Sequence, residues 1–196
     1  IYNMLDIVDE MIIGGGMAFT FDKVLNGTAI GSSLFDEEGA KTVPDIMKKA
    51  AEKGVKIHLP TDYVCADKFS EDAKTCIRTN AEGIDDGWLG LDIGPNTIKS
   101  NADVIRRSKT VFWNGPQGVF EIPAFASGSL SMLDEIINCT ANGGTSVAGG
   151  GDTVALLKKV PGSAEKLSHV STGGGASLEL VEGKQLPGVV ALSDRA

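Results

Sequence analysis

Runs of three glycines recur in this sequence, and each lies between a short apolar run and a helix-forming run. They are Gly14–Gly16, Gly149–Gly151 and Gly173–Gly175. An apolar strand that ends in bare backbone and continues into a helix leaves amide N–H groups pointing outward at the positive end of the helix dipole. A phosphate is the natural ligand of such a turn. The last two runs lie on either side of one predicted helix, which suggests a single polyphosphate held from two sides.

The order of strands and helices sets the expected fold class. The apolar strands are short and lack period-two alternation, which is typical of strands covered on both faces. We therefore expect an α/β fold: a doubly wound, mainly parallel sheet with helices on both faces, in a Rossmann-like three-layer arrangement. Ligands of such sheets bind beyond the carboxyl ends of the strands. The turns at 14–16, 114–118, 149–151 and 173–175 all fall there, so four turns should face one crevice.

Apolar periodicity and Gly or Pro punctuation predict the individual elements. The expected strands are 10–13, 55–59, 110–113, 145–148 and one at Val170, and the expected helices are 17–25, 36–53, 96–107, 124–140, 152–159 and 176–181. Residues 61–90 differ, because short runs at 63–66 and 76–79 lie among polar turns, which favours an antiparallel excursion. Residues 1–9 are interpreted as the end of a helix that starts before Ile1, as in a fragment.

Composition narrows the classes of function. The chain has 196 residues, enough for one substantial domain, and a formal net charge of −8, which argues against nucleic acid or an anionic membrane as partner. No apolar run reaches the roughly 18 residues of a membrane span, and no signal peptide is evident. Cys65, Cys76 and Cys139 fit no metal spacing and are expected to be reduced thiols. His58 and His169 adjoin apolar strands and are expected in the core or at strand ends.

Two stretches carry the chemistry. Asp152 and Thr153 open a helix after a glycine turn, where Asp152 could hold Mg²⁺ and Thr153 could bind phosphate; the alternative is that Asp152 is a plain helix cap. The stretch Asn114–Glu121 combines a rigid Gly-Pro floor, apolar Val119 and Phe120, and an acidic acceptor. An adenosine needs an apolar slot for its base and an acceptor for its ribose, although Glu121 could equally be solvated surface.

Assembled, these stretches resemble the carboxy-terminal, nucleotide-binding domain of the phosphoglycerate kinase family. The resemblance covers essentially the whole chain and rests on the segments Ile12–Ala18, Gly90–Pro95, Trp113–Pro116, Gly118–Glu121, Gly149–Thr153 and Ser168–Glu179. It implies a phosphotransferase with a carboxyl group as acceptor (EC 2.7.2.3), which moves a phosphoryl group between 1,3-bisphosphoglycerate and ADP in glycolysis. It also implies Mg²⁺ with ADP or ATP as cofactor, and a cytoplasmic monomer.

The resemblance assigns roles residue by residue. The adenine pocket would be lined by Gly15, Gly16, Leu34, Gly90, Leu91 and Pro116, with Val119 and Phe120 beside it. Glu121 would bind the ribose, Asn114 the nucleotide phosphates, Asp152 the metal ion and Thr153 a phosphate. The transferring group would be cradled by the amides of Gly150, Gly151, Gly173 and Gly174, and Ser171 and Thr172 would lie near a hinge.

The resemblance also implies a missing partner. The family's first strand of this domain, and an amino-terminal domain that supplies the cationic residues and binds 3-phosphoglycerate, have no counterpart in these residues. Residues 1–196 are therefore expected to form one nucleotide-binding domain that lacks its first strand, with a tail at 185–196 that packs on the absent domain. Without that cationic half the chain alone should be inactive, and it should expose apolar surface.

Two other functions stay open. One is a nucleotide-binding module without catalysis in any assembly. The other is a dinucleotide-dependent oxidoreductase on a similar sheet, which the lack of a Gly-x-Gly-x-x-Gly run disfavours.

Overall fold

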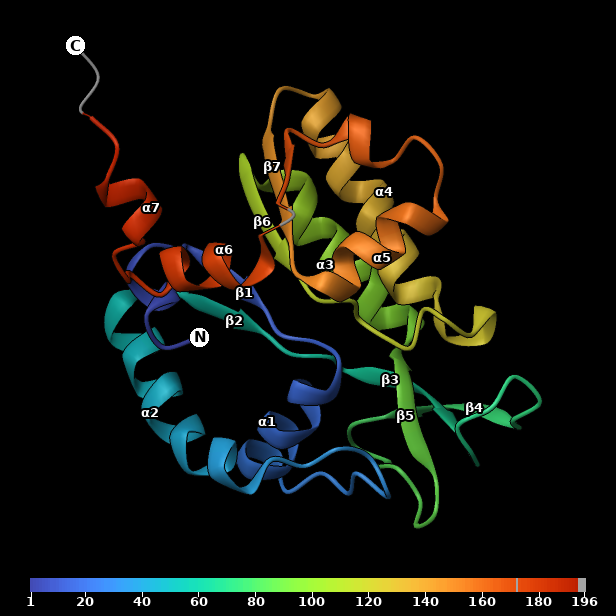
Figure 1. The fold of residues 1–196 in the computed structure, drawn as a ribbon. Helices are drawn as coiled ribbons and strands as arrows, with labels where there is room; N and C mark the ends of the chain where they lie inside the picture. Colours follow the sequence, from blue (N-terminus) through green and yellow to red (C-terminus); the bar gives the residue numbers. More distant parts are fainter. Residues whose placement is uncertain (172, 194–196) are drawn as a thin grey trace.

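Strands and helices alternate along most of the chain in the computed structural model, which describes residues 1–171 and 173–193 (Figure 1). The α-helices are α1 (Gly16–Asn26), α2 (Glu37–Lys53), α3 (Pro95–Arg107), α4 (Ser127–Ala141), α5 (Gly151–Lys159), α6 (Gly174–Val181) and α7 (Pro187–Val190). Short 3-10 turns lie at Met4–Asp6, Pro123–Phe125 and Ala164–Lys166. The strands are β1 (Glu10–Ile12), β2 (Lys56–His58), β3 (Asp62–Ala66), β4 (Thr75–Thr79), β5 (Leu89–Ile93), β6 (Thr110–Asn114), β7 (Thr145–Gly149) and β8 (His169–Val170).

The parallel strands form two separate groups rather than one open sheet. Strands β1 and β2 pair with each other, and β6, β7 and β8 form a second parallel sheet in that order. The α/β class and the parallel pairing are confirmed, whereas a continuous sheet is not observed in the described residues. Glu10 of β1 forms an ion pair with Arg107, the last residue of α3, so side chains connect the two groups here.

The antiparallel excursion is also confirmed, and it is larger than predicted. Strand β3 pairs antiparallel with both β4 and β5, which gives a three-stranded sheet in the order β4-β3-β5. Strand β5 was not predicted, because Leu89, Leu91 and Ile93 alternate with Gly90 and Asp92 and do not form a continuous apolar run. Its place in the fold depends on the pairing with β3, which is distant in sequence.

Helix α2 shows how local sequence sets the element boundaries. Asp36 precedes the first turn and its carboxylate accepts a hydrogen bond from the Glu38 amide at 3.1 Å. Gly54 ends the helix in the left-handed conformation, with φ of 71°. Val43, Ile46 and Ala50 are buried on one face, as the apolar spacing predicts.

The prediction for residues 1–9 is wrong. Only Met4–Asp6 forms a 3-10 turn, and the rest of this segment is not helical. The segment is held by tertiary contacts: Leu5 is buried in a core cluster with Val43 and Ile46, and the ammonium of Lys49 donates to the Tyr2 carbonyl at 2.9 Å. Packing against α2 therefore overrides the helical spacing.

Each parallel group has its own core. One core lies between β6, β7 and helices α3, α4 and α5, and its largest buried side chains include Trp113, Leu133, Ile136 and Leu156. The other packs α1 and α2 against β1 and β2. In Figure 1 these two bodies form the upper and lower parts of the molecule, and the antiparallel sheet projects beside them.

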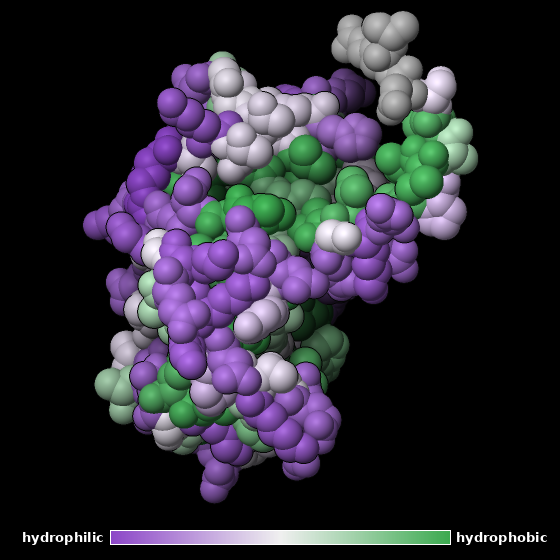
Figure 2. Space-filling model, turned by 90° about the vertical axis from the view of Figure 1, so that its left-hand side faces the viewer, coloured by the Kyte–Doolittle hydropathy of each residue, from purple (hydrophilic) through white to green (hydrophobic). Residues whose placement is uncertain are grey.

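Apolar side chains are exposed near the end of the chain. Leu180 of α6, Val189 and Val190 of α7, and Leu192 are each more than half exposed. Figure 2 looks at the side that carries α2, α6 and α7, and shows hydrophobic surface among hydrophilic areas. Apolar exposure was predicted. No helix among the described residues has the length and hydropathy needed to cross a membrane.

Candidate functional site

The turn after β6 is fixed to the start of α5. Asn114 is the last residue of β6, and Gly115 follows with φ of 94°. The Gly115 amide donates to the hydroxyl of Thr153 at 2.8 Å, and the Trp113 indole donates to the Gly115 carbonyl at 2.9 Å. Thr153 is fully buried, so its hydroxyl oxygen serves first as an acceptor that positions this turn.

The turn after β7 is open backbone. Gly150 precedes α5 with φ of 90°, and a side chain there would lie 3.2 Å from the Asn114 amide group. Asn114 thus faces this turn, while Gly151 has open space around it. Asp152 is exposed and is the second residue of the helix. The interpretation of Asp152 as a plain cap is wrong, because Gly150 holds the cap position and no side chain caps this helix.

The turn after β8 lies next to the turn after β7. The Ser171 amide donates to the Ala148 carbonyl at 2.8 Å, and the Ser177 amide donates to the Gly173 carbonyl at 2.9 Å. A Cβ added at Gly149 would lie 4.0 Å from that of Ser177. The structure therefore brings the end of β7 next to the end of β8 and to Ser177 in the first part of α6. Thr172 lies outside the described residues, so its predicted place near a hinge has no structural counterpart here.

The turn after β1 contacts the turn after β6. A Cβ at Gly14 would lie 2.0 Å from Oε1 of Gln117, and one at Gly15 would lie 3.2 Å from the Pro116 carbonyl oxygen. A Cβ at Gly16 would lie 2.8 Å from Cδ1 of Leu34, whose side chain is 73% exposed. Bare backbone at Gly14 and Gly15 therefore lets the two turns approach, while Gly16 faces only the end of an exposed side chain.

Strand β5 forms the neighbouring wall. The Leu91 carbonyl accepts a hydrogen bond from the Val119 amide at 2.8 Å, and the Gly90 amide donates to the Ser33 hydroxyl at 2.9 Å. Phe120 is only 6% exposed and belongs to the core beneath Lys159, whose ammonium lies 5.1 Å from the ring centroid. Glu121 is exposed at the end of this loop.

Contacts thus link all four predicted turns in sequence: the β1 turn to the β6 turn, the β6 turn to the β7 turn, and the β7 turn to the β8 turn.

Two surface hollows lie elsewhere, one between Asn26–Ala29 and Asn80–Gly83 and one at the ends of α3 and α4. Neither is lined by a predicted site residue. Among the described residues no three His, Cys, Asp or Glu side chains form a metal cluster. Asp152 alone could therefore hold a hard cation only with oxygens supplied by a ligand.

Sequence reasoning missed two buried polar residues behind the turns. Gln117 is 6% exposed. Its backbone N–H donates to the Ser129 hydroxyl at 2.9 Å, while the side-chain oxygen Oε1 has no hydrogen-bond partner. Asp92 accepts hydrogen bonds from the Gly128 amide at 2.8 Å and from the Ile93 amide at 2.9 Å. Burial raises the pKa of Asp92 to about 6. A polar residue between apolar or glycine neighbours was the only signal available in the sequence.

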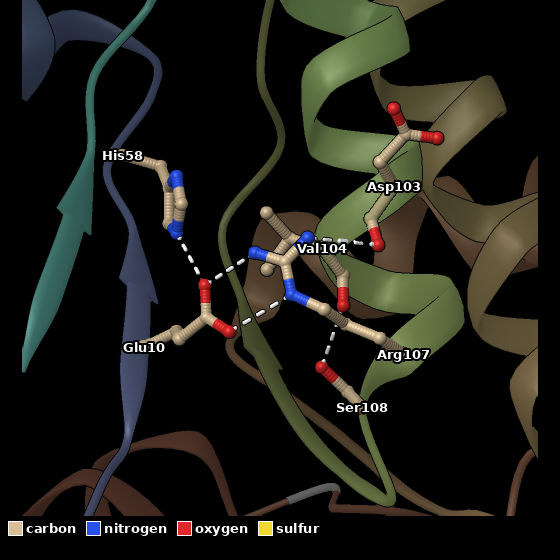
Figure 3. Close-up of polar contacts among 6 residues, drawn as sticks. All are labelled: Glu10, His58, Asp103, Val104, Arg107 and Ser108. Atoms are coloured by element: carbon tan, nitrogen blue, oxygen red, sulfur yellow. Dashed lines mark hydrogen bonds and ion pairs between the residues drawn. The ribbon is translucent and has the colours of Figure 1, made fainter.

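A charged cluster spans the seam between the two parallel groups (Figure 3). Arg107, the last residue of α3, donates from Nε to Oε1 of Glu10 at 3.0 Å and from Nη2 to Oε2. His58 ends β2, at a strand end as predicted, and its Nε2 lies 2.6 Å from Oε2 of Glu10. Arg107, followed by His58, lowers the pKa of Glu10 to about 2. Glu10 opens β1, at the opposite end from the glycine turn, so the cluster has a structural role.

Comparison with known proteins identifies the relatives of this arrangement. A sequence model of the family described as phosphoglycerate kinase matches residues 1–184. The chain is 69% identical over 196 residues to phosphoglycerate kinase of Sterkiella nova, and 59% identical over 194 residues to phosphoglycerate kinase 1 of Homo sapiens. These alignments cover 100% and 99% of the chain but 47% and 46% of the relatives.

Solved structures of phosphoglycerate kinases agree with the sequence comparison. The phosphoglycerate kinase of Coxiella burnetii superposes with a TM-score of 0.89 at 41% identity, over 96% of this chain and 47% of that one. The Pyrococcus horikoshii enzyme, at 23% identity and a TM-score of 0.79, shares the fold. The chain spans about half the length of the curated relatives it matches.

Proposed function

The chain belongs to the phosphoglycerate kinase family, and on that premise we propose that it is the carboxy-terminal, nucleotide-binding half of such an enzyme. The observation that carries the proposal is the meeting of the β7 and β8 glycine turns beside the end of β6. Backbone amides at these turns suit a polyphosphate, as their sequence alone predicts. The side-chain contacts of Asn114 and Thr153 with the same turns add polar groups at the right place.

The phosphates would lie against the β7 and β8 turns. The amides of Gly150, Gly151, Gly173 and Gly174 cradle the transferring group, and Asn114 reaches the nucleotide phosphates. Thr153 holds the turn through its oxygen, and its hydroxyl hydrogen would donate to a phosphate if the turn opens, because the side chain is fully buried here. Asp152 binds Mg²⁺, which neutralises phosphate charge. These residues fit a magnesium nucleotide, because one exposed carboxylate lies beside a bare backbone.

The nucleoside would lie along the β1, β5 and β6 edges. Gly15, Gly16 and Pro116 supply a flat floor, Leu34 covers it from the exposed side, and Gly90 and Leu91 form the neighbouring wall. Val119 and Phe120 back the pocket from the core rather than line it, since Phe120 is almost fully buried. Glu121 is exposed where a ribose would need an acceptor.

The whole enzyme would transfer a phosphoryl group between 1,3-bisphosphoglycerate and ADP, giving 3-phosphoglycerate and ATP. This chain contributes nucleotide binding and orientation, and an amino-terminal half contributes the phosphoglycerate site and the cationic groups. We therefore expect the chain alone to be inactive. We expect the complete protein to be a cytoplasmic monomer with neither a nucleic-acid nor a membrane partner.

The two parallel groups would be the halves of one doubly wound sheet. The usual strand order in such sheets is 3-2-1-4-5-6. The observed β2-β1 and β6-β7-β8 match the two outer parts of that order, and position 1 falls at the seam crossed by Glu10 and Arg107. The first strand of this domain, which has no counterpart in residues 1–196, would take that position. The exposed apolar residues of α7 and the tail at 185–196 would pack on the amino-terminal domain.

Binding of ADP to this chain, measured by calorimetry with and without Mg²⁺, tests the proposal. Asp152→Asn should weaken Mg-ADP at least about tenfold, equivalent to about 1.4 kcal/mol, and should change metal-free ADP far less. Asp134→Asn, an exposed carboxylate on α4, is the matched control and should change neither. Equal losses with and without Mg²⁺ would remove Asp152 from the metal site. Failure of the folded chain to bind ADP at all would overturn the proposal.

Activity needs the complementary half. Mixing this chain with the amino-terminal half of the Sterkiella relative should restore ADP-dependent phosphoryl transfer. A folded complex without activity would instead favour a non-catalytic nucleotide-binding module, whose affinity for ADP would not respond to 3-phosphoglycerate.

A further inference from the structure

The antiparallel sheet places two cysteines directly opposite one another. Cys65 of β3 is the register partner of Cys76 of β4. Directly opposed residues of an antiparallel pair point to the same face of the sheet. The two side chains belong to one apolar cluster, in which Cys65 is buried and Cys76 and Trp88 pack against it. Both thiols are free in this structure.

Backbone hydrogen bonds show that the spacing suits a disulfide. The Asn80 amide donates to the Thr61 carbonyl at 3.1 Å, and the Asp67 amide donates to the Lys74 carbonyl at 3.2 Å. Hydrogen-bonded and non-hydrogen-bonded pairs alternate along an antiparallel ladder. The 61–80 and 67–74 pairs are hydrogen-bonded and lie an even number of positions from the 65–76 pair. The 65–76 pair is therefore also hydrogen-bonded, with Cα atoms about 5.5 Å apart. Disulfides span Cα separations of about 4.4–6.8 Å.

Closing the bond requires the strands to move slightly, and the sheet allows it. Cβ atoms in hydrogen-bonded pairs stand somewhat further apart than a relaxed disulfide prefers. Strand β4 is an edge strand, held only by β3 among the described strands, and most of its residues are not buried. It can therefore shift toward β3 without disturbing a second partner. The bond would be strained, and strained disulfides are readily reduced.

The two sulfurs differ in access to solvent. Cys65 is fully buried, and burial raises the pKa of its thiol to about 12. Cys76 is half-buried on the edge strand, so an oxidant from solvent meets it first. Cys76 is therefore the sulfur that is oxidised first, and Cys65 is the sulfur that resolves the sulfenic acid.

We propose that Cys65 and Cys76 form an oxidation site, which a peroxide converts to a reversible intramolecular disulfide. The Cys76 thiolate attacks one oxygen of hydrogen peroxide, the O–O bond breaks, and Cys76 sulfenic acid forms while hydroxide leaves and takes a proton to become water. The Cys65 sulfur then attacks the Cys76 sulfur, the S–O bond breaks, and the Cys65 proton leaves with the hydroxyl as a second water. Two thiols are oxidised by two electrons in total, and one peroxide is reduced to two waters.

Oxidation of the folded chain at neutral pH, followed by alkylation of the remaining thiols and mass spectrometry, tests this site. Of the free cysteines, only Cys139 should still be alkylated, with a 65–76 link in the non-reduced peptide map and a mass loss of about 2 Da. Millimolar glutathione should restore all the thiols.

Two variants make the test decisive, and neither replaces Cys65, the fully buried member of the pair. Cys76→Ser changes a half-buried edge position and should leave Cys65 reduced after the same treatment. Cys139→Ser is the matched control and should still form the link. The proposal is overturned if Cys65 is still alkylated in the treated parent chain, if the link joins two molecules, or if Cys65 is oxidised equally in the Cys76→Ser variant.

Discussion

At the scale of single residues, Gln117 is the most unusual side chain near the candidate site. Its Oε1 is buried without a hydrogen-bond partner, against the backbone of Gly14. An unsatisfied buried acceptor costs about 1–3 kcal/mol, whereas an apolar group of the same shape avoids that cost. Gln117 therefore lowers the stability of the chain where it packs against the β1 turn.

Gln117→Leu should stabilise the chain by about 1 kcal/mol in urea or thermal unfolding, because it removes the unsatisfied oxygen and keeps most of the volume. Gln185→Leu, at an exposed position, is the control and should change the free energy of unfolding very little. A destabilised Gln117→Leu variant would show that the amide makes a hydrogen bond that is needed in solution.

The glycines of the site could be predicted from sequence, but the residues behind them could not. Three adjacent glycines after an apolar run already indicate bare backbone at a helix start, whatever they contact. Gln117 and Asp92 matter because of Gly14 and Gly128, which are distant in sequence. Nothing local distinguishes a buried amide in a glycine-rich turn from an exposed one, so only the packed structure identifies them.

At the scale of elements, helices and strands follow apolar spacing, while their assembly does not. Helices α1 to α6, the parallel strands and the 63–66 with 76–79 pairing were predicted within a few residues, whereas α7 lies in the stretch that was expected to be a tail. Strand β5 and the division of the parallel strands into two groups were not, because both depend on which strands become neighbours. The helix prediction for residues 1–9 was wrong for a related reason, because burial of Leu5 against α2 decides their conformation.

The seam between β1 and α3 offers a test at this scale. Arg107 and His58 hold the pKa of Glu10 at about 2, below its ordinary 4.5, so the charged carboxylate stabilises the folded state. That contribution is fully present above pH 4.5 and is lost as the pH falls toward 2. Allowing for solvent at the half-exposed Arg107, it is worth about 2 kcal/mol.

Glu10→Gln should therefore lower the free energy of unfolding at pH 7 by about 2 kcal/mol and flatten its decline between pH 4.5 and 2. Urea titrations across this range measure both effects. Glu165→Gln, at an exposed position, is the control and should leave the profile unchanged. A variant that retains the full acid-dependent loss would show that other carboxylates cause it.

At the scale of the whole molecule, buried carboxylates act in the opposite direction on the pH dependence of stability. Burial raises the pKa of Asp92 to about 6, above its ordinary 3.8, and burial also raises the pKa of Asp22. The folded chain then holds these protons more strongly than the unfolded chain. Stability should rise as the pH falls from 7 toward 4, and Asp92 alone contributes up to about 3 kcal/mol of that rise.

Together the two effects predict a stability maximum at mildly acidic pH, near 4.5 to 5, where Asp92 is protonated and Glu10 is still charged. Lowering the pH from 7 also reduces the negative net charge from its formal value of −8, which acts in the same direction. Melting temperatures from pH 3 to 8 should show this maximum.

Asp92→Asn should flatten the part of the profile between pH 7 and 4 and leave the decline at lower pH intact. The reason is that the side-chain amide cannot titrate but still accepts one of the two backbone hydrogen bonds. Asp134→Asn should keep both parts of the profile. If the Asp92→Asn profile retains the parent rise between pH 7 and 4, the carboxyl of Asp92 is already ionised at little cost, and the explanation of the maximum is wrong.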